Sequence, residues 1–353
     1  EFFDQRFDFE QYVGNSLLLT FGTGLIALLL VVVFDGPLSE LPDFPVSALW
    51  LVPVYCFCHN ICELLLSIWR AQSKPVAFGL FRVGRTLLEI GLSVLFVTAA
   101  AKGWRGRIDG MLVAAISFGF LALIFLFRAK VRVSASVAYL KDIAKFGAPL
   151  IPHTLGAIVM IYSDRLFITK MIGLSETGAY TVGYQVAMAI SLLQSSFNLA
   201  WVPWFYDRLN QKNNLINRQI VQISYVYFLV ILLCALALTL ISPLVFRVFI
   251  HESFHDAIQF VFWISIGFAF DGMYKMVVNY IFYLKKTYLI SIITVVTATL
   301  NLILNYFFIS WYGAVGAAKA TALCMLFEFI LVWWMSSRIY PMPWNLKKTD
   351  TNP

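Results

Sequence analysis

Residues 219–246 read QIVQISYVYFLVILLCALALTLISPLVF, a stretch without any Asp, Glu, Lys, Arg or His. A helix needs about 20 apolar residues to cross the hydrocarbon layer of a membrane, so this stretch is long enough to span one. A second stretch without such residues runs from Thr177 to Tyr206. Both indicate helices that are surrounded by lipid rather than by water.

Ten apolar runs of this kind follow one another along the chain, each bounded by charged residues, Pro or Gly. They cover about residues 15–34, 46–69, 76–100, 109–127, 146–169, 177–204, 219–242, 257–283, 287–309 and 313–337. The alternating pattern of a β-barrel is absent, and helices are the other way to satisfy every backbone group in lipid. We therefore predict an all-α polytopic membrane protein with ten transmembrane helices.

The composition excludes most other classes of protein. Of 353 residues, 60% are apolar and 13% are charged, and the mean hydropathy is +0.80. A soluble domain is about 45–50% apolar and about 25% charged, so this chain cannot cover a water-facing surface with polar groups. A soluble enzyme and a disordered protein are excluded. The five cysteines all lie inside apolar runs, which argues against a disulfide framework.

The basic residues outside the apolar runs predict the orientation of the chain. With ten crossings both termini lie on one side, which we predict to be the cytoplasm because cytoplasmic loops are enriched in Lys and Arg. The side with the termini holds sixteen, namely Arg6, Arg70, Lys74, Arg128, Lys130, Arg132, Lys141, Lys145, Arg208, Lys212, Arg218, Lys285, Lys286, Arg338, Lys347 and Lys348. The opposite side holds five, namely Lys102, Arg105, Arg107, Lys170 and Arg247.

Several charged residues lie within the apolar runs, where a charge costs about 2.5–3.5 kcal/mol on insertion scales and usually faces a bundle interior or a wet cavity. Arg82, Arg85 and Glu89 share one helical face by their spacing. Asp271 and Lys275 are four residues apart and can pair. Ion pairs that only fix helix packing are the alternative interpretation of these charges.

Asp164 and Arg165 are adjacent and point about 100° apart, so we expect separate partners for them. Glu328 and Lys319 also lie in an apolar run, half a turn out of phase, and Lys319 falls near the external end of its helix.

One short segment combines Cys56, Cys58, His59, Cys62 and Glu63. Cys58 with Cys62, and His59 with Glu63, are pairs on different helical faces, so at most two or three of these side chains can converge on one ion. We predict no metal site here, because free Cys is commonly a small buried apolar residue. His59 and Glu63 are instead candidates for a proton-linked pair that faces a cavity.

Neither nucleotide hydrolysis nor loop-based catalysis is indicated. The chain has no Gly-x4-Gly-Lys-Ser/Thr motif, and its external loops are too short to build an active site, so we predict that it is not an enzyme. The charged stretch 128–145 separates four helices from six. We expect an incomplete N-terminal lobe at 1–135, a C-terminal lobe at 136–340 and a cytoplasmic tail at 341–353.

Two stretches, 146–207 and 282–322, carry a recognisable set of motifs. These are Gly147, Pro149 and Pro152; Asp164-Arg165; Gly178-x-Tyr180 with Gly183-Tyr184; Lys285-Lys286-Thr287; Asn301 and Asn305; and Gly313-x-x-Gly316-Ala317-Ala318. In these motifs the chain resembles the polysaccharide flippase family of the MATE-like MOP exporter superfamily, which acts on O-antigen and other lipid-linked oligosaccharides. The resemblance implies twelve helices in two six-helix lobes around a central cavity. Here ten helices would be the third to the twelfth, so the N-terminal lobe would lack the first two. The chain begins at Glu1 without an initiator Met, and both a fragment and a gene product without these two helices stay open.

The resemblance also implies a function and a set of functional residues. Family members move undecaprenyl-pyrophosphate-linked oligosaccharide across the bacterial inner membrane for O-antigen, capsule or exopolysaccharide assembly. We expect a diphosphate headgroup to meet Arg82, Arg85, Arg165 and Lys275. The acidic residues and the histidine that would orient those cations, or take H⁺ or Na⁺ in ion-coupled transport, are Glu89, Asp164, Asp271, His59 and Glu63.

Partners follow from the same resemblance. They are lipid-linked oligosaccharide, membrane lipids, and a polysaccharide polymerase and chain-length regulator; nucleic acid is not expected, and no cofactor is expected beyond a coupling H⁺ or Na⁺. Two alternatives stay open, a MATE-type multidrug or cation antiporter and a non-transporting membrane component of polysaccharide assembly. The intramembrane cations roughly balance the acids, which argues mildly against a site for cationic drugs.

Overall fold

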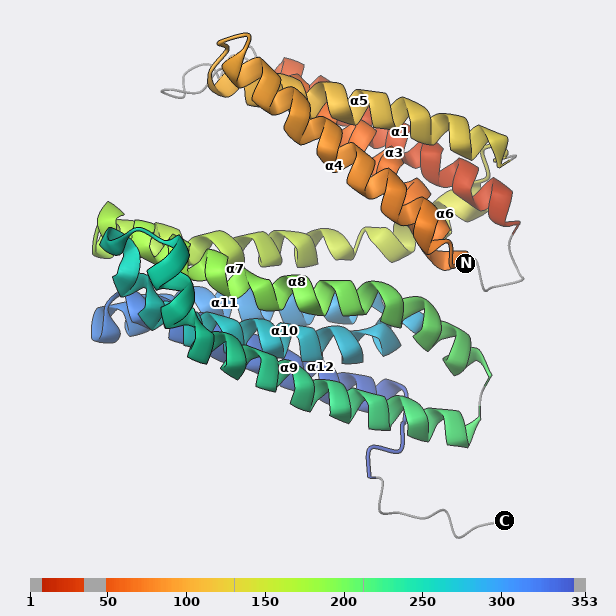
Figure 1. The fold of residues 1–353 in the computed structure, drawn as a ribbon. Helices are drawn as coiled ribbons and strands as arrows, with labels where there is room; N and C mark the ends of the chain where they lie inside the picture. The colour runs from red at the N-terminus through yellow and green to blue at the C-terminus, as the bar shows by residue number, and fades with distance from the viewer. Residues whose placement is uncertain (1–7, 35–48, 130, 212, 346–353) are drawn as a thin grey trace. The chain divides into compact units, whose positions relative to one another are not determined.

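The computed structural model describes residues 8–34, 49–129, 131–211 and 213–345 (Figure 1). Contacts within the chain divide it into two units, which we call the N-terminal unit, Glu1–Ala144, and the C-terminal unit, Lys145–Pro353. The lobe boundary at 135/136 that the sequence predicts stays a prediction. Five of the basic residues counted for the topology, Arg6, Lys130, Lys212, Lys347 and Lys348, lie outside the described residues, as does most of the expected tail.

All ten predicted segments are helices. The N-terminal unit has α1 (Phe9–Val33), α3 (Leu51–Ala71), α4 (Pro75–Thr98) and α5 (Trp104–Arg128). The C-terminal unit has α7 (Leu150–Met171), α8 (Leu174–Asn210), α9 (Asn214–Phe249), α10 (Ile258–Tyr283), α11 (Thr287–Tyr312) and α12 (Ala314–Ile339). A short 3₁₀ helix, η2 (Glu252–Ala257), precedes α10.

Nine spans in the described part of the chain are long and apolar enough to cross a membrane. The remaining long helix is α4, whose 24 residues include Arg82, Arg85 and Glu89. The predicted fold class, an all-α polytopic membrane protein, is therefore confirmed.

Helices α8 and α9 are longer than the sequence predicts. They contain 37 and 36 residues, or about 55 Å each at 1.5 Å per residue, against about 30 Å of hydrocarbon. Pro203 and Pro243 lie inside these helices. A proline within a long helix in lipid is tolerated because neighbouring groups can satisfy the freed backbone atoms.

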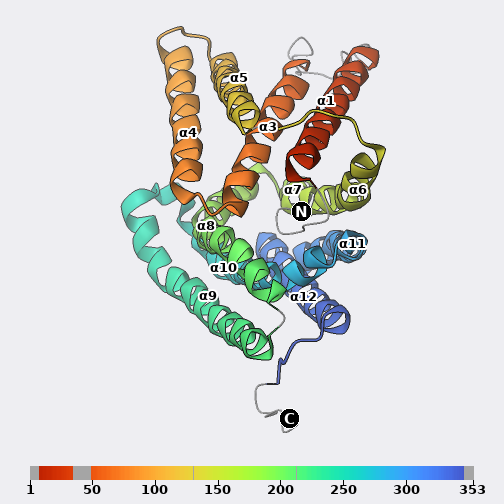
Figure 2. The same ribbon diagram turned by 90° about the vertical axis from the view of Figure 1, so that its right-hand side faces the viewer.

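In the N-terminal unit α3 packs against α5, α1 and α4, and α4 and α5 form a hairpin (Figure 2). A small apolar core, which includes Ile61, Leu65, Phe81 and Leu126, holds these helices together. The exposed residues of α4 include Leu80, Leu87 and Val94, as expected for a helix with a lipid-facing side.

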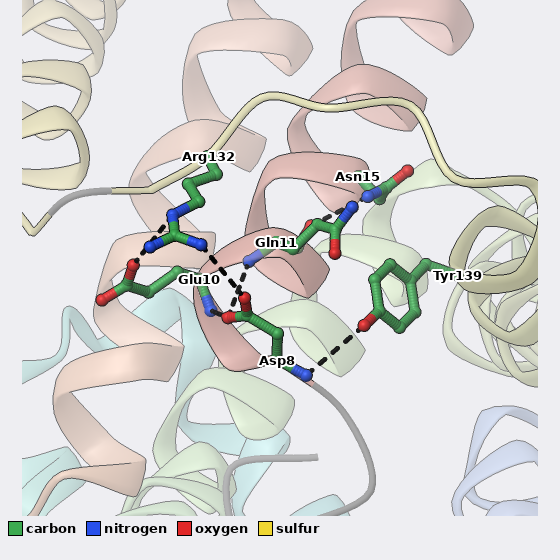
Figure 3. Close-up of polar contacts among 6 residues, drawn as sticks. All are labelled: Asp8, Glu10, Gln11, Asn15, Arg132 and Tyr139. Atoms are coloured by element: carbon green, nitrogen blue, oxygen red, sulfur yellow. Dashed lines mark hydrogen bonds and ion pairs between the residues drawn. The ribbon is translucent and has the colours of Figure 1, made fainter.

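The charged stretch 128–145, which separates four helices from six, contains an extended segment at 131–136 and then the start of α6 (Val137–Gly147). The extended segment lies along the start of α1, where Arg132 forms ion pairs of 3.7 Å with both Asp8 and Glu10 (Figure 3). The fully buried Asn15 donates to the Ser134 carbonyl and accepts from the Ser136 amide. These contacts tie the two ends of the N-terminal unit together.

The C-terminal unit is built around α10, which packs against α8, α9 and α12 and is buried along most of its length (Figure 1). Helices α11 and α12 form a second hairpin beside it, joined at Gly313, whose φ of 62° favours glycine. Small residues at the start of α12, namely Gly316, Ala317 and Ala318, let the two helices approach closely, which is how membrane helices gain packing contacts.

We predict that Gly316→Ala destabilises the C-terminal unit by about 1–3 kcal/mol, the usual cost of overpacking. A methyl group there would overlap the backbone carbonyl of Phe308, which cannot rotate away. Gly178→Ala is the control, since its methyl would meet the Phe254 ring at an ordinary 3.9 Å. Thermal unfolding of the detergent-solubilised protein measures both variants, and equal melting temperatures would contradict the prediction.

Candidate functional site

One polar stripe runs along α11 and faces α7. Its members are buried and recur every three, four or seven residues, which places them on one face of the helix. They are Thr287, Ser291, Thr294, Asn301 and Asn305. We call these five residues the α11 polar stripe.

Each member of the stripe bonds to α7 or to the residues just before it. Thr287 and Ser291 donate to the backbone carbonyls of Phe146 and Pro149. Thr294 contacts His153, Asn301 accepts from Ser163 at 2.8 Å, and Asn305 donates to Asp164 at 2.7 Å. Because lipid offers no hydrogen bonds, these contacts determine how α7 and α11 face each other.

Asp164 lies at the Asn305 end of this interface and is 1% exposed. Its carboxylate accepts three hydrogen bonds from three helices: from the Tyr180 hydroxyl of α8 at 2.6 Å, from Asn305 of α11, and from the Thr321 hydroxyl of α12 at 2.7 Å. A buried carboxylate is costly unless it is hydrogen-bonded, and here three donors satisfy it. Asp164 therefore connects four helices of the C-terminal unit.

Arg165 lies beside this carboxylate in the sequence but uses other partners, as its direction on the helix predicts. Its guanidinium carbon is 4.4 Å from the ring centroid of Tyr184 and 5.9 Å from that of Tyr180, within reach of a cation–π interaction. One of its nitrogens donates to the Ile161 carbonyl at 2.7 Å. The side chain is half-buried, so it presents a cation that the neighbouring carboxylate does not neutralise by direct contact.

Asp271 and Lys275 of α10 form the ion pair that their spacing predicts, at 3.0 Å, with side chains 27% and 30% exposed. The amide nitrogen of Gln194 on α8 also donates to Asp271, at 2.6 Å. This second charged group within the C-terminal unit is only partly buried, so the ammonium of Lys275 can reach a further anion.

In the N-terminal unit the structure brings Arg85 to His59. The guanidinium is 2.7 Å from the Nδ1 atom of His59, and Arg85 is 7% exposed. His59 therefore contacts Arg85 on α4 rather than Glu63 on its own helix. Its ring also stacks on Tyr55.

The other members of the α4 charged face are less buried. Arg82 is exposed and its guanidinium carbon lies 5.8 Å from the Phe78 ring centroid, and Glu89 is half-buried. Within the described residues, no three His, Cys, Asp or Glu side chains are close enough to hold a metal ion.

The sequence interpretation missed several polar residues that the structure places in the C-terminal unit. Tyr180, Asn301 and Asn305 were noted as motif residues only, and the four-residue spacing of the two asparagines was the signal that they share a face. Glu328 was recognised as an intramembrane acid but given no partner, whereas Thr294 donates to it at 2.8 Å. His153 passed unnoticed, although it is an ionisable residue within a lipid-spanning run.

The fold is similar to that of solved MATE transporters. A crystal structure of MATE in complex with MaL6 superposes with a TM-score of 0.80, at 15% identity, covering 94% of this chain and 79% of that one. A Vibrio cholerae MATE transporter gives a TM-score of 0.76 at 17% identity, with the same coverage. The protein thus has a MATE-like fold.

The family follows from the sequence. A family model described as polysaccharide biosynthesis protein matches residues 5–209, more than half of the chain, and the chain belongs to that family. The resemblance noted in the sequence is confirmed. With the fold, this membership identifies a multi-pass membrane protein of a polysaccharide biosynthesis family.

Proteins of two bacteria are similar to this chain in sequence. A Haemophilus influenzae protein, "Lsg locus putative protein 1", is 31% identical over 146 residues, which cover 41% of this chain and 36% of the relative. A Shigella flexneri protein, "Putative O-antigen transporter", is 20% identical over 334 residues, covering 92% of this chain and 77% of the relative. The chain spans less than two thirds of the length of the Haemophilus influenzae relative, and also of a second protein of that organism, of which it covers 59%.

We expect Thr321→Val to destabilise the C-terminal unit by about 1–3 kcal/mol, the cost of leaving a buried acceptor without its donor. The substitution keeps the side-chain shape but removes one of three donors to Asp164. Thr321→Ser keeps the hydroxyl and is the matched control. Thermal unfolding in detergent checks the difference, and a Val variant as stable as the Ser variant would show that the bond adds nothing.

Proposed function

We propose that this protein flips undecaprenyl-pyrophosphate-linked oligosaccharide across the bacterial inner membrane for the synthesis of surface polysaccharide. Membership of the polysaccharide biosynthesis family and the MATE-like fold support this class of transport. The Shigella flexneri relative is named for O-antigen transport, which matches a lipid-linked saccharide as the substrate class.

The observation that carries the proposal is the environment of Arg165. A guanidinium has five N–H donors, and the described residues offer this one a single hydrogen-bond acceptor, the Ile161 carbonyl. The rings of Tyr180 and Tyr184 hold the positive charge in place without neutralising it. Arg165 is therefore prepared to bind an anion, and bidentate binding of a phosphate is the interaction that suits Arg best.

The remaining cations extend this proposal to the other predicted residues. Arg82, Arg85 and Lys275 are proposed to bind the diphosphate at successive stages of its passage. Asp164 is proposed to orient Arg165 indirectly, because it fixes the hydroxyl of Tyr180, whose ring lies against the guanidinium.

Acidic residues and a histidine are proposed to orient the other cations or to take part in ion coupling. They lie near those cations in the fold or in the sequence. Asp271 contacts Lys275, and His59 contacts Arg85. Glu89 and Glu63 are proposed for the same role in the N-terminal unit, on α4 and α3.

The location and partners are proposals of the same kind. We place both termini of the chain in the cytoplasm, on the excess of Lys and Arg in the loops on their side. A polysaccharide polymerase and a chain-length regulator would receive the flipped substrate. A multidrug or cation antiporter is the competing function, and the experiments below separate the two.

We predict that Arg165→Ala, Arg82→Ala and Arg85→Ala each lower surface polysaccharide at least about tenfold in cells that depend on this protein for it. Each removes a cation that the proposed diphosphate needs, while the membrane-embedded amount of protein stays the same. Immunoblotting of the membrane fraction and gel analysis of the polysaccharide measure the two quantities.

Arg338→Ala is the matched control for these variants. Arg338 also lies over an aromatic ring, 5.2 Å from Trp334, but at the exposed end of α12. We expect normal polysaccharide from it. Normal polysaccharide from all three test variants would overturn the proposed function, and loss of drug resistance in its place would favour the antiporter.

Exchanging the charges of Asp271 and Lys275 separates substrate binding from packing. The double variant Asp271→Lys with Lys275→Asp keeps the ion pair, and the amide of Gln194 can rotate so that its oxygen faces the new ammonium. If Lys275 only fixed packing, polysaccharide would be unchanged. We expect a reduction of about tenfold or more with normal protein levels, because the cation has moved by one helical turn from the site where it meets the diphosphate.

A further inference from the structure

A chain of hydrogen bonds joins three helices of the C-terminal unit at a site that none of the roles above uses. The Nδ1 atom of His153 on α7 is 2.7 Å from the hydroxyl of Thr294 on α11. That hydroxyl is 2.8 Å from the Oε1 atom of Glu328 on α12. A residue able to hold a proton therefore lies at each end of the chain, with a hydroxyl that can pass a proton between them.

The direction of these bonds fixes the protonation of the histidine. A Thr hydroxyl has one proton, and with an ionised Glu328 that proton points to the carboxylate. Nδ1 of His153 must then carry a proton and donate it to Thr294. When Glu328 is instead the protonated partner, the carboxyl donates to Thr294, and the Thr294 hydroxyl turns to donate to an unprotonated Nδ1.

The two arrangements differ by the transfer of one proton. The Nδ1–H bond of a His153 imidazolium breaks and its proton joins the Thr294 oxygen, while the Thr294 proton leaves to form an O–H bond on Glu328. The imidazole and the carboxyl are then neutral, and Thr294 is again a hydroxyl. No further reactant is needed, so the chain can hold one exchangeable proton at either end.

We propose that His153, Thr294 and Glu328 form a proton-binding site of the transporter and that its occupancy sets how α7 and α12 pack on α11. The ligand is a proton, and the site is separate from the residues proposed above for orienting the cations or for ion coupling. The proposal rests on the proposed transport function for its biological use, but the binding itself belongs to the C-terminal unit alone.

The position of the site suits exchange with water. His153 is the fourth residue of α7 and is half-buried, whereas Thr294 of the α11 polar stripe is 1% exposed. A proton that enters at His153 can thus reach Glu328 without passing through lipid. The N-terminal turn of α7 disfavours a positive imidazolium, which shifts the proton towards the carboxyl.

The charged and titratable groups around the site are few. Helix α10, which packs against α12, carries Asp271, Lys275 and Tyr274, and the charge of Asp271 acts on both His153 and Glu328. Glu328 also acts on Tyr274 and on the thiol of Cys324, one turn before it on α12. On α7 the nearest charges are Asp164 and Arg165, three turns away from His153, and on α12 Lys319 is more than two turns from Glu328. Helix α11 contributes no Asp, Glu, Lys, Arg or His, and α8 contributes Gln194, the partner of Asp271.

The packing next to the site links the binding of a proton to the contacts between the helices. Gly156 of α7 lies against Thr294, and a methyl group on it would come within 3.0 Å of the Thr294 side chain. The Thr294 side chain therefore lies in an interface with little free space, where the charge on Glu328 determines which polar contact it makes with α12. Protonation neutralises Glu328, so this side chain of α12 no longer needs a hydrogen-bond donor on α11.

The test is a carboxyl titration of the purified protein by infrared difference spectroscopy between pH 5 and 8, the range in which an imidazole and a buried carboxyl exchange protons. We expect a carboxyl signal that disappears in Glu328→Gln and persists in Asp271→Asn. Thr294→Ser, which keeps the hydroxyl, leaves its midpoint unchanged. Thr294→Val, which interrupts the chain, shifts the midpoint by about one pH unit or more, as does His153→Gln.

The outcomes are decisive in both directions. A carboxyl signal that survives Glu328→Gln, or a midpoint that Thr294→Val and His153→Gln leave in place, overturns the proposal. The Ser and Gln variants are conservative, so the test holds if the Val variant fails to fold. The measurement uses no saccharide, so it stands apart from the polysaccharide assay of the Arg165 variant: loss of the titration with normal sensitivity to Arg165→Ala refutes the proton site alone.

Discussion

The contact on which the C-terminal unit depends is the polar stripe of α11 against α7. In lipid the hydrophobic effect does not drive helices together, so the pairing of two helices has to come from close packing and from polar groups that find partners only in one arrangement. Five buried polar residues of α11 meet α7 or the residues before it. A rotation of either helix would break these contacts, and this gives the two helices one definite register.

The same interface explains why adjacent residues have opposite roles. Asp164 points into the stripe, where Asn305, Tyr180 and Thr321 satisfy its carboxylate. Arg165 points about 100° away, onto the faces of Tyr184 and Tyr180. Tyr180 serves both residues, because its hydroxyl bonds to the acid and its ring supports the cation. The position of the proposed phosphate-binding group is thereby set by a structural carboxylate that it does not touch.

Hydropathy was sufficient to predict the helices, but it did not predict the contacts of the candidate site. Ten runs predicted ten helices, because a span of lipid needs a continuous apolar stretch whatever its neighbours are. Helical spacing also predicted the Asp271–Lys275 pair, which is local to one helix. The contacts of Arg85 with His59 and of Thr294 with Glu328 join residues far apart in the sequence. Nothing in the spacing along one helix states which face of another helix it will meet.

The ends of α8 and α9 were mispredicted for a related reason. The predicted spans 177–204 and 219–242 end next to Pro203 and Pro243, and a proline inside a helix removes one backbone hydrogen bond and crowds the preceding turn. In a membrane protein the alternative to a helix is an unsatisfied backbone in lipid, which costs more than the missing bond. Both helices therefore continue past their prolines. Each proline leaves a backbone carbonyl without its helical donor, and such a weakened point is where a long helix of a transporter can bend while its two halves stay rigid.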